Sequence, residues 1–237
     1  MNAESVEFQR VPIGPIDCLK ASKQLMGDKY WLFLGIGVVG ILIGSFVPLG
    51  ILLGPMMCGI YYCYFRRMRG ETIEFGMLFK GFDYFVESLL ATIILAGAMM
   101  VVMLPMYCLL FAGFMNFAAD MERGGGDEEA AMAMFGLMGV FYLLVILLSM
   151  ILMVFFAFVY PLIVDRDLKA VPALRTSLRA TWANFGGMLG LVCLLILIST
   201  VASACCYVPV FFVLPFNLGA LALAYRKVFP ENSKPAA

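Results

Sequence analysis

In the segment Leu174–Gly190, LRTSLRATWANFGGMLG, an amphipathic run continues without a break into an apolar one, and this pattern indicates the fold. Leu178 and Phe185 follow its first leucine at helical spacing, and Arg175 and Arg179 lie beside this apolar stripe. A helix with an apolar stripe and basic side chains lies flat at a membrane surface, with the stripe toward the acyl chains and the basic groups at the headgroups. The stretch therefore predicts an interfacial helix that leads directly into a membrane-spanning helix.

The same pattern occurs near the start of the chain. Leu19–Gly35, LKASKQLMGDKYWLFLG, matches the first stretch with Ser22 opposite Ser177, and it carries its own stripe of Ile16, Leu19, Met26 and Tyr30. The segments that follow also agree, since GPMMCGIYYCYFRRM from Gly54 parallels LPFNLGALALAYRKV from Leu214. Both copies have the same orientation, so we predict an internal repeat.

A third, weaker copy is predicted between these two. Phe75, Leu78, Phe79, Phe82 and Phe85 form an apolar stripe at helical spacing just before an apolar run. Each unit would then be a short interfacial helix followed by a helical hairpin. We expect a single integral membrane domain over 1–237, built from units at 14–68, 73–167 and 171–228.

Composition places the chain among membrane proteins. Hydrophobic residues make up 63% of the sequence and charged residues only 14%, too few for the surface of a soluble domain of this size. The apolar spans are Trp31–Val47, Leu49–Phe65, Val86–Phe117, Ala131–Val164, Gly186–Val201 and Tyr207–Tyr225. The predicted fold is all-α and polytopic, with about six transmembrane helices. The first apolar run begins too late for a cleaved signal peptide, so none is expected.

Two features of span length need explanation. The first two spans are about 17 residues each, near the lower limit for crossing a bilayer, so a re-entrant hairpin around Pro48 is the alternative. The middle two spans exceed 30 residues and would reach beyond the hydrocarbon core. They should tilt, kink at Pro105 or Pro161, or project from the membrane toward a partner.

The basic residues predict the orientation, because short loops rich in Lys and Arg stay in the cytoplasm. Fifteen of the sixteen Lys and Arg residues can be placed on one side, and only Arg123, in the acidic loop Asp120–Glu129, lies on the other. Both termini are therefore predicted to be cytoplasmic, in a multi-pass protein of the inner membrane. The interfacial basic residues are Lys20, Lys23, Arg66, Arg67, Arg175 and Arg179.

Small and polar residues within the spans predict helix contacts. Gly40 and Gly44 form a GxxxG pair, which allows close helix packing either within one chain or between copies. Asn217 follows Pro215 by two residues inside the last span. Its amide is predicted to make an interhelical contact, and a polar path through the membrane is the alternative.

The sequence contains no arrangement that specifies a reaction. It has no His, the interiors of its spans hold no carboxylate, and its seven Cys match neither zinc nor redox spacings. Asp165 and Asp167 are predicted to lie in a solvated loop, and Lys80 is predicted to form a surface ion pair with the nearby carboxylates of Asp83 and Glu87. We expect no enzyme activity, no catalytic residue, no cofactor and no metal, and the zero net charge gives no reason to expect nucleic acid.

The residues LRTSLRATWANF, with VDRDL upstream, resemble a broad group of proteins. These are uncharacterised bacterial integral membrane proteins related to the membrane domain of glycerophosphodiester phosphodiesterases. The soluble phosphodiesterase domain of that group has no counterpart in these residues. The resemblance therefore implies about six spans and a bacterial inner-membrane location, and it carries over no catalytic residue.

Two functional classes are consistent with these patterns. The first is a non-catalytic, membrane-organising or accessory subunit that contacts membrane lipids and associates as a homo-oligomer or within a membrane-protein complex. The alternative is a transporter or channel for a lipid or small apolar solute, which the repeat and the proline-broken spans favour.

Overall fold

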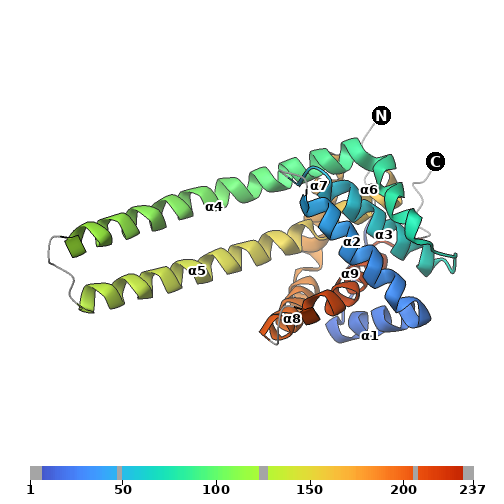
Figure 1. Cartoon of the computed structure of the whole chain (residues 1–237). Coiled ribbons are helices and arrows are strands. Elements are labelled where there is room, and N and C mark those ends of the chain that lie inside the picture. Colours follow the sequence, from blue (N-terminus) through green and yellow to red (C-terminus); the bar gives the residue numbers. More distant parts are fainter. Residues whose placement is uncertain (1–6, 47–49, 123–127, 205–207, 232–237) are drawn as a thin grey trace. The chain divides into compact units, whose positions relative to one another are not determined.

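A computed structural model of the chain describes residues 7–46, 50–122, 128–204 and 208–231, and in these residues all regular structure is helical (Figure 1). The all-α prediction is confirmed. The elements are α1 (Pro15–Met26), η1 (Gly27–Lys29), α2 (Tyr30–Phe46), α3 (Leu53–Met68), η3 (Phe75–Tyr84), α4 (Phe85–Glu122), α5 (Glu128–Phe156), α6 (Val159–Arg166), α7 (Ala170–Ala183), α8 (Phe185–Ala204) and α9 (Val208–Val228). Pro48 and Arg123, each part of a predicted turn, lie outside the described residues.

Within this described part, five helical stretches are long and apolar enough to cross a membrane. They are Pro15–Phe46, Phe75–Ala119, Met134–Arg166, Phe185–Ala204 and Val208–Val228. The predicted second span instead forms α3, whose 16 residues reach only about 24 Å against a hydrocarbon core of roughly 30 Å. Most of α3 is buried, so this helix is the centre of a packed core.

The chain divides into two compact units. One comprises residues 1–93 and 153–237, and we refer to its described part as the body. The other comprises residues 94–152, and we refer to its described part as the hairpin. The two units differ in how their apolar side chains are covered.

The core of the body forms where α3, α6 and α9 meet. α3 packs against α2, η3, α6 and α9. The ring of Tyr225 on α9 lies 5.3 Å from that of Phe65 on α3 and 5.8 Å from that of Phe158, just before α6. All three rings are buried. These aromatic contacts join α3, α6 and α9, which are the last helices of the three predicted units.

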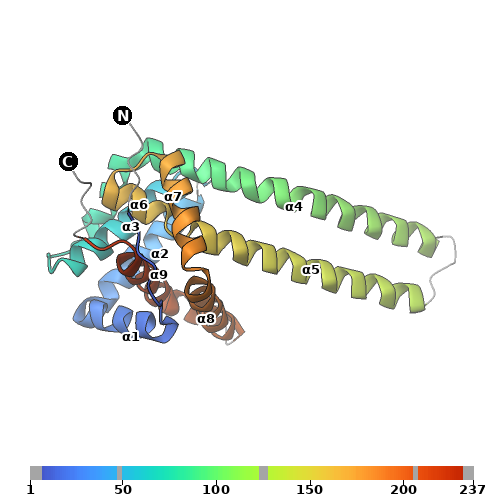
Figure 2. The same ribbon diagram turned by 180° about the vertical axis from the view of Figure 1, so that it is seen from behind.

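Each of those segments packs on the last helix of another predicted unit. α1 packs on α9, η3 packs on α3, and α7 packs on α6 (Figures 1 and 2). The contact between η3 and α3 is the closest, because a Cβ at Gly59 would collide with the carbonyl of Leu78, and one at Gly81 with the carbonyl of Pro55. Two backbones can approach this closely only where both positions are glycine.

The predicted apolar stripes of the interfacial segments do not face one environment. Met26 on α1 and Leu174 on α7 are buried inside the body, whereas Ile16 and Leu178 are exposed. The prediction that Met26 and Leu174 face acyl chains is wrong. Since α1 and α7 pack on α9 and α6, these residues are covered by protein.

The hairpin is covered much less than the body. Its two helices, α4 from Ile94 and α5 up to Leu152, run side by side, and the rings of Tyr107 and Phe141 lie 6.5 Å apart (Figure 1). Most of its large apolar side chains are exposed, Leu109 at 72% for example. The hairpin therefore presents an extended apolar surface.

The two prolines of the predicted repeat unit 73–167, Pro105 and Pro161, have different effects. α4 remains one helix through Pro105. The helix that begins as α5 ends at Phe156 and resumes as α6 at Val159, two residues before Pro161. Pro161 has no N–H to bond the carbonyl of Ala157, so the break lies where a proline is expected to cause it.

Candidate functional site

A buried ion pair lies at the end of α6. The side chain of Asp165 is only 8% exposed, and its Oδ1 lies 2.7 Å from Nη2 of Arg226 on α9. The Tyr225 hydroxyl donates a hydrogen bond to Asp165 at 2.8 Å, and the Arg226 guanidinium lies 4.7 Å from the centre of the Phe65 ring on α3. The prediction of a solvated loop is therefore wrong for Asp165, although Asp167 is exposed.

The polar contacts of this cluster hold helix ends together. Arg166 also contacts Asp165, at 3.2 Å, and donates to the carbonyl of Pro230 at 2.8 Å. The carboxylate of Asp165 is thus engaged by two arginines and one phenol. The cluster joins the carboxyl ends of α3, α6 and α9 at one place.

Hydroxyl groups from α1 and α7 bond the backbone near two of the prolines. Ser177 donates to the carbonyl of Phe155 at 2.7 Å and accepts from the N–H of Phe158 at 3.3 Å, so it bridges the break between α5 and α6. Ser22 donates to the carbonyl of Phe216 at 3.1 Å, one residue after Pro215. These bonds satisfy backbone groups beside a disturbed helix ladder.

The predicted packing residues lie at helix contacts inside the body. A Cβ at Gly40 would lie 3.0 Å from the Ile60 side chain on α3, and one at Gly44 would lie 3.0 Å from the Cα of Leu53. Both glycines are buried, so they face α3 of the same chain. Asn217 on α9 donates to the Ser199 hydroxyl on α8 at 2.9 Å. Its Oδ1 is buried without a hydrogen-bond partner among the described residues.

The predicted interfacial basic residues fall into two groups. Lys20 and Lys23 on α1 are exposed, and so are Arg175 and Arg179 on α7. The other two, at the end of α3, have acidic partners.

Arg66 pairs with Glu71 at 2.5 Å, and Arg67 pairs with Asp28 at 3.3 Å. A hydrogen bond from Arg69, together with the positive charges of Arg69 and Arg66, lowers the pKa of Glu71. Arg66 and Arg67 therefore make contacts within the body.

The two acidic residues near Lys80, Asp83 and Glu87, make different contacts. Lys80 and Asp83 form the predicted surface ion pair, at 3.9 Å. Glu87 instead accepts a hydrogen bond from the N–H of Ala170 at 2.8 Å, so its carboxylate lies at the amino end of α7. A negative charge is favourable there because the first amides of a helix lack partners. The predicted pairing of Glu87 with Lys80 is not the contact that the structure gives this carboxylate.

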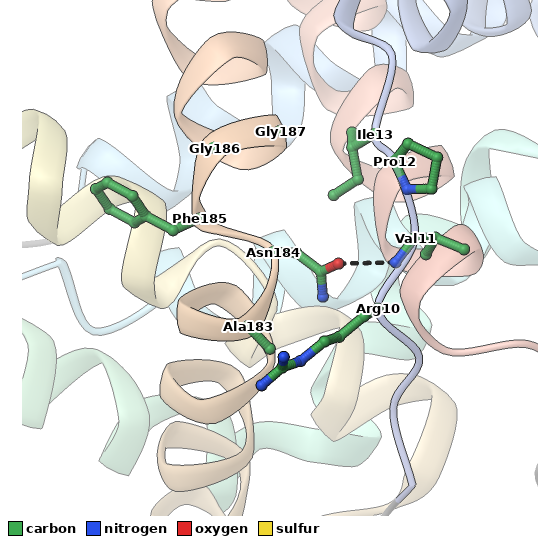
Figure 3. A pocket seen from close by; sticks show the side chains of 9 residues that line it. All are labelled: Arg10, Val11, Pro12, Ile13, Ala183, Asn184, Phe185, Gly186 and Gly187. Atoms are coloured by element: carbon green, nitrogen blue, oxygen red, sulfur yellow. Dashed lines mark hydrogen bonds between the residues drawn. The ribbon is translucent and has the colours of Figure 1, made fainter.

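A cavity of about 490 Å³ lies where α7 meets α8 (Figure 3). It is lined by two segments, Arg10–Ile13 and Ala183–Gly187. Asn184, which is buried, joins the two: its Oδ1 accepts from the N–H of Val11 at 2.9 Å, and its Nδ2 donates to the carbonyl of Gln9 at 3.1 Å. Sequence reasoning missed this residue, although an Asn between two helical segments is a recognisable capping signal.

In the part of the chain that the structure describes, no group of three or more His, Cys, Asp or Glu residues could hold a metal ion. The fold and these contacts define a helical membrane protein with a packed body and an exposed apolar hairpin. The chain belongs to the family described as "Domain of unknown function (DUF7847)", whose model matches residues 70–233. No curated protein and no solved structure matches the chain.

Proposed function

We propose that the chain is a non-catalytic, membrane-organising protein that associates with copies of itself or with a membrane-protein complex. The observation that carries this proposal is the hairpin, where Leu109 and Phe135 are 72% and 73% exposed and α4 and α5 cover each other little. The body, in contrast, buries its aromatic residues. The hairpin is the part of the chain best suited to a partner within the membrane.

The glycines of the hairpin support close contact with another helix. Gly97, Gly113, Gly136 and Gly139 have open space where a side chain would be. Small residues allow helices to approach closely in a membrane, where packing and not the hydrophobic effect favours association. Gly40 and Gly44 already contact α3 of the same chain, so self-association would use the hairpin.

The proposal places the protein in the bacterial inner membrane with both termini in the cytoplasm. The contact between the N–H of Gln9 and the carbonyl of Val228, at 2.9 Å, supports a location of both ends on one side. The Asp165 cluster supports the same topology, because it gathers the basic ends of α3 and α9 with the loop after α6. Positively charged ends on one side are typical of the cytoplasmic face.

We also propose that the chain is a threefold repeat of an interfacial helix and a hairpin. Three observations support this: η3 packs on α3, α7 on α6, and α1 on α9. Ser22, Gly81 and Ser177 each follow a leucine by three residues, and each lies at the close contact with the helix of another unit. The proposed kinship with membrane domains of glycerophosphodiester phosphodiesterases rests on the Leu174–Phe185 stretch and on VDRDL at 164–168 upstream of it.

The absence of catalysis is part of the proposal and rests on how the polar groups are used. Asp165 and Glu87 hold helix ends, and Ser22 and Ser177 bond backbone carbonyls. The sequence contains no His that could act as an acid or base.

The test is the number of copies per complex. Labelled protein would be reconstituted in vesicles at low density, and photobleaching steps would be counted for the wild type and for Gly136→Leu with Gly139→Leu. We expect several steps for the wild type and fewer for the variant, because the leucines keep a neighbouring helix away. Gly76→Leu is the control, since Gly76 in the body also has open space around it. Single steps for the wild type with no co-purifying partner would contradict the proposal.

The alternative, a transporter or channel for a lipid or small apolar solute, is favoured by one observation. The buried Oδ1 of Asn217 has no hydrogen-bond partner among the described residues. Such a group is costly inside a membrane unless it serves a ligand or water. Movement of a fluorescent lipid between leaflets of reconstituted vesicles should then fall in Asn217→Leu, and equal rates with and without the protein would exclude this alternative for lipids.

A further inference from the structure

The cavity at the α7–α8 junction has one charged lining residue, Arg10, on an anchored stretch of backbone. Asn184 bonds the carbonyl of Gln9 and the N–H of Val11, so the backbone on both sides of Arg10 is held. Beyond Val11, the side chain of Ile13 covers Gly187 so closely that a Cβ there would lie 2.8 Å from the Cβ of Ile13. The segment that carries Arg10 is therefore anchored across the junction.

The lining of the cavity suits an anion. Arg10 is the only charged residue among the nine that line it, and its side chain extends past Asn184 toward Ala183 (Figure 3). A guanidinium group offers five N–H donors in a planar fork, which matches two oxygens of a phosphate. Gly186 leaves room for the ligand, because a Cβ at this position would meet no atom within 4 Å.

The neighbouring face of α7 indicates where this cavity lies relative to a membrane. The exposed residues of α7 include Arg175, Leu178, Arg179 and Trp182, the last at 72%, and α7 contains no acidic residue. Aromatic and basic side chains together are typical of the headgroup layer. α7 leads through Asn184 into α8, which is long and apolar enough to cross a membrane, so the cavity lies at the start of that helix.

We propose that this cavity binds the phosphate-bearing headgroup of an anionic phospholipid, with Arg10 as the phosphate ligand and with Arg175 and Arg179 attracting anionic lipids to the same region. The volume of about 490 Å³ is within the range of small-ligand sites. The proposal rests on the membrane location in the proposed function. It adds a defined lipid site on the body, independent of the hairpin.

The test is native mass spectrometry of the full-length protein in detergent, with phosphatidylglycerol or phosphatidylcholine added at equal concentration. We expect one retained phosphatidylglycerol and little phosphatidylcholine. Arg10→Gln removes the charge, and Gly186→Leu fills the cavity without a clash; each should weaken phosphatidylglycerol retention about tenfold, since a hydrogen-bonded charge pair is lost or blocked.

Matched controls separate this site from general surface charge. Lys20→Gln removes an exposed cation of α1, and Gly76→Leu adds the same side chain at another open glycine, so both should retain phosphatidylglycerol like the wild type. Equal retention by the wild type and Arg10→Gln would overturn the proposal. Displacement of the lipid by inorganic phosphate alone would overturn it as well, because the site would then belong to a soluble phosphate.

The same spectra report the mass of the assembly. Loss of lipid at an unchanged assembly mass in Arg10→Gln supports the lipid site whatever the role of the hairpin. A wild-type monomer that retains one phosphatidylglycerol would contradict the proposed self-association and leave the lipid site supported. The two proposals therefore fail on different readouts.

Discussion

The ion pair between Asp165 and Arg226 should contribute strongly to the stability of the body. Asp165→Asn leaves the Arg226 guanidinium, whose side chain is 13% exposed, without its charged partner. Removing one member of a buried ion pair typically costs about 3–5 kcal/mol. We expect about 3 kcal/mol for Asp165→Asn, because Asn can still accept the hydrogen bond that Tyr225 donates.

A double-mutant cycle measures this interaction directly. Asp165→Asn, Arg226→Gln and the double variant would be unfolded reversibly in mixed detergent and dodecyl sulfate micelles, with circular dichroism as the readout. The double variant should be more stable than the sum of the single changes predicts, by roughly 1–3 kcal/mol. Asp83→Asn is the control, since the Lys80–Asp83 pair is 61% and 66% exposed and should contribute less than about 1 kcal/mol. Additive single changes would refute the structural role of the pair.

Three further changes test other contacts of the body. Gly59→Ala should destabilise the body by about 2 kcal/mol or more in the same unfolding assay because its Cβ meets backbone, whereas Gly76→Ala should have little effect; equal stability of the two would contradict the close contact. Ser177→Ala should cost roughly 1–3 kcal/mol, since a buried amide at the helix break loses its partner, and an unchanged unfolding midpoint would show that the amide has another acceptor. Asn184→Ala should release the N-terminal segment, seen as faster hydrogen exchange at the amide of Val11, and unchanged exchange would show that the segment is held elsewhere.

The membrane class could be predicted because it depends on composition and on the length of apolar runs. The limits of that signal are visible at α3. Its apolar run predicts a span near the lower length limit, and hydropathy does not distinguish a helix covered by lipid from one covered by other helices. The glycines that allow this burial, Gly54 and Gly59, contact η3 and α4, and those contacts depend on the folded chain.

The polar contacts were the hardest to predict, since they join residues far apart in sequence. Asp165 and Arg226 are 61 positions apart, and Val11 and Asn184 are 173 apart. A local pattern of two aspartates beside a basic residue is most often solvated, and nothing nearby indicates the partner. Gly40 shows the intermediate case, in which the GxxxG spacing predicted a helix contact and the fold supplied its partner, α3.

The proposed function requires the chain to associate through its hairpin. Native mass spectrometry of the protein extracted gently from its own membrane measures this association, with Gly136→Leu plus Gly139→Leu measured in parallel. We expect a defined homo-oligomer, or a complex of fixed stoichiometry with another membrane protein, that is lost in the variant while the variant remains folded. A wild-type monomer, or an assembly that the two leucines leave unchanged, would contradict it.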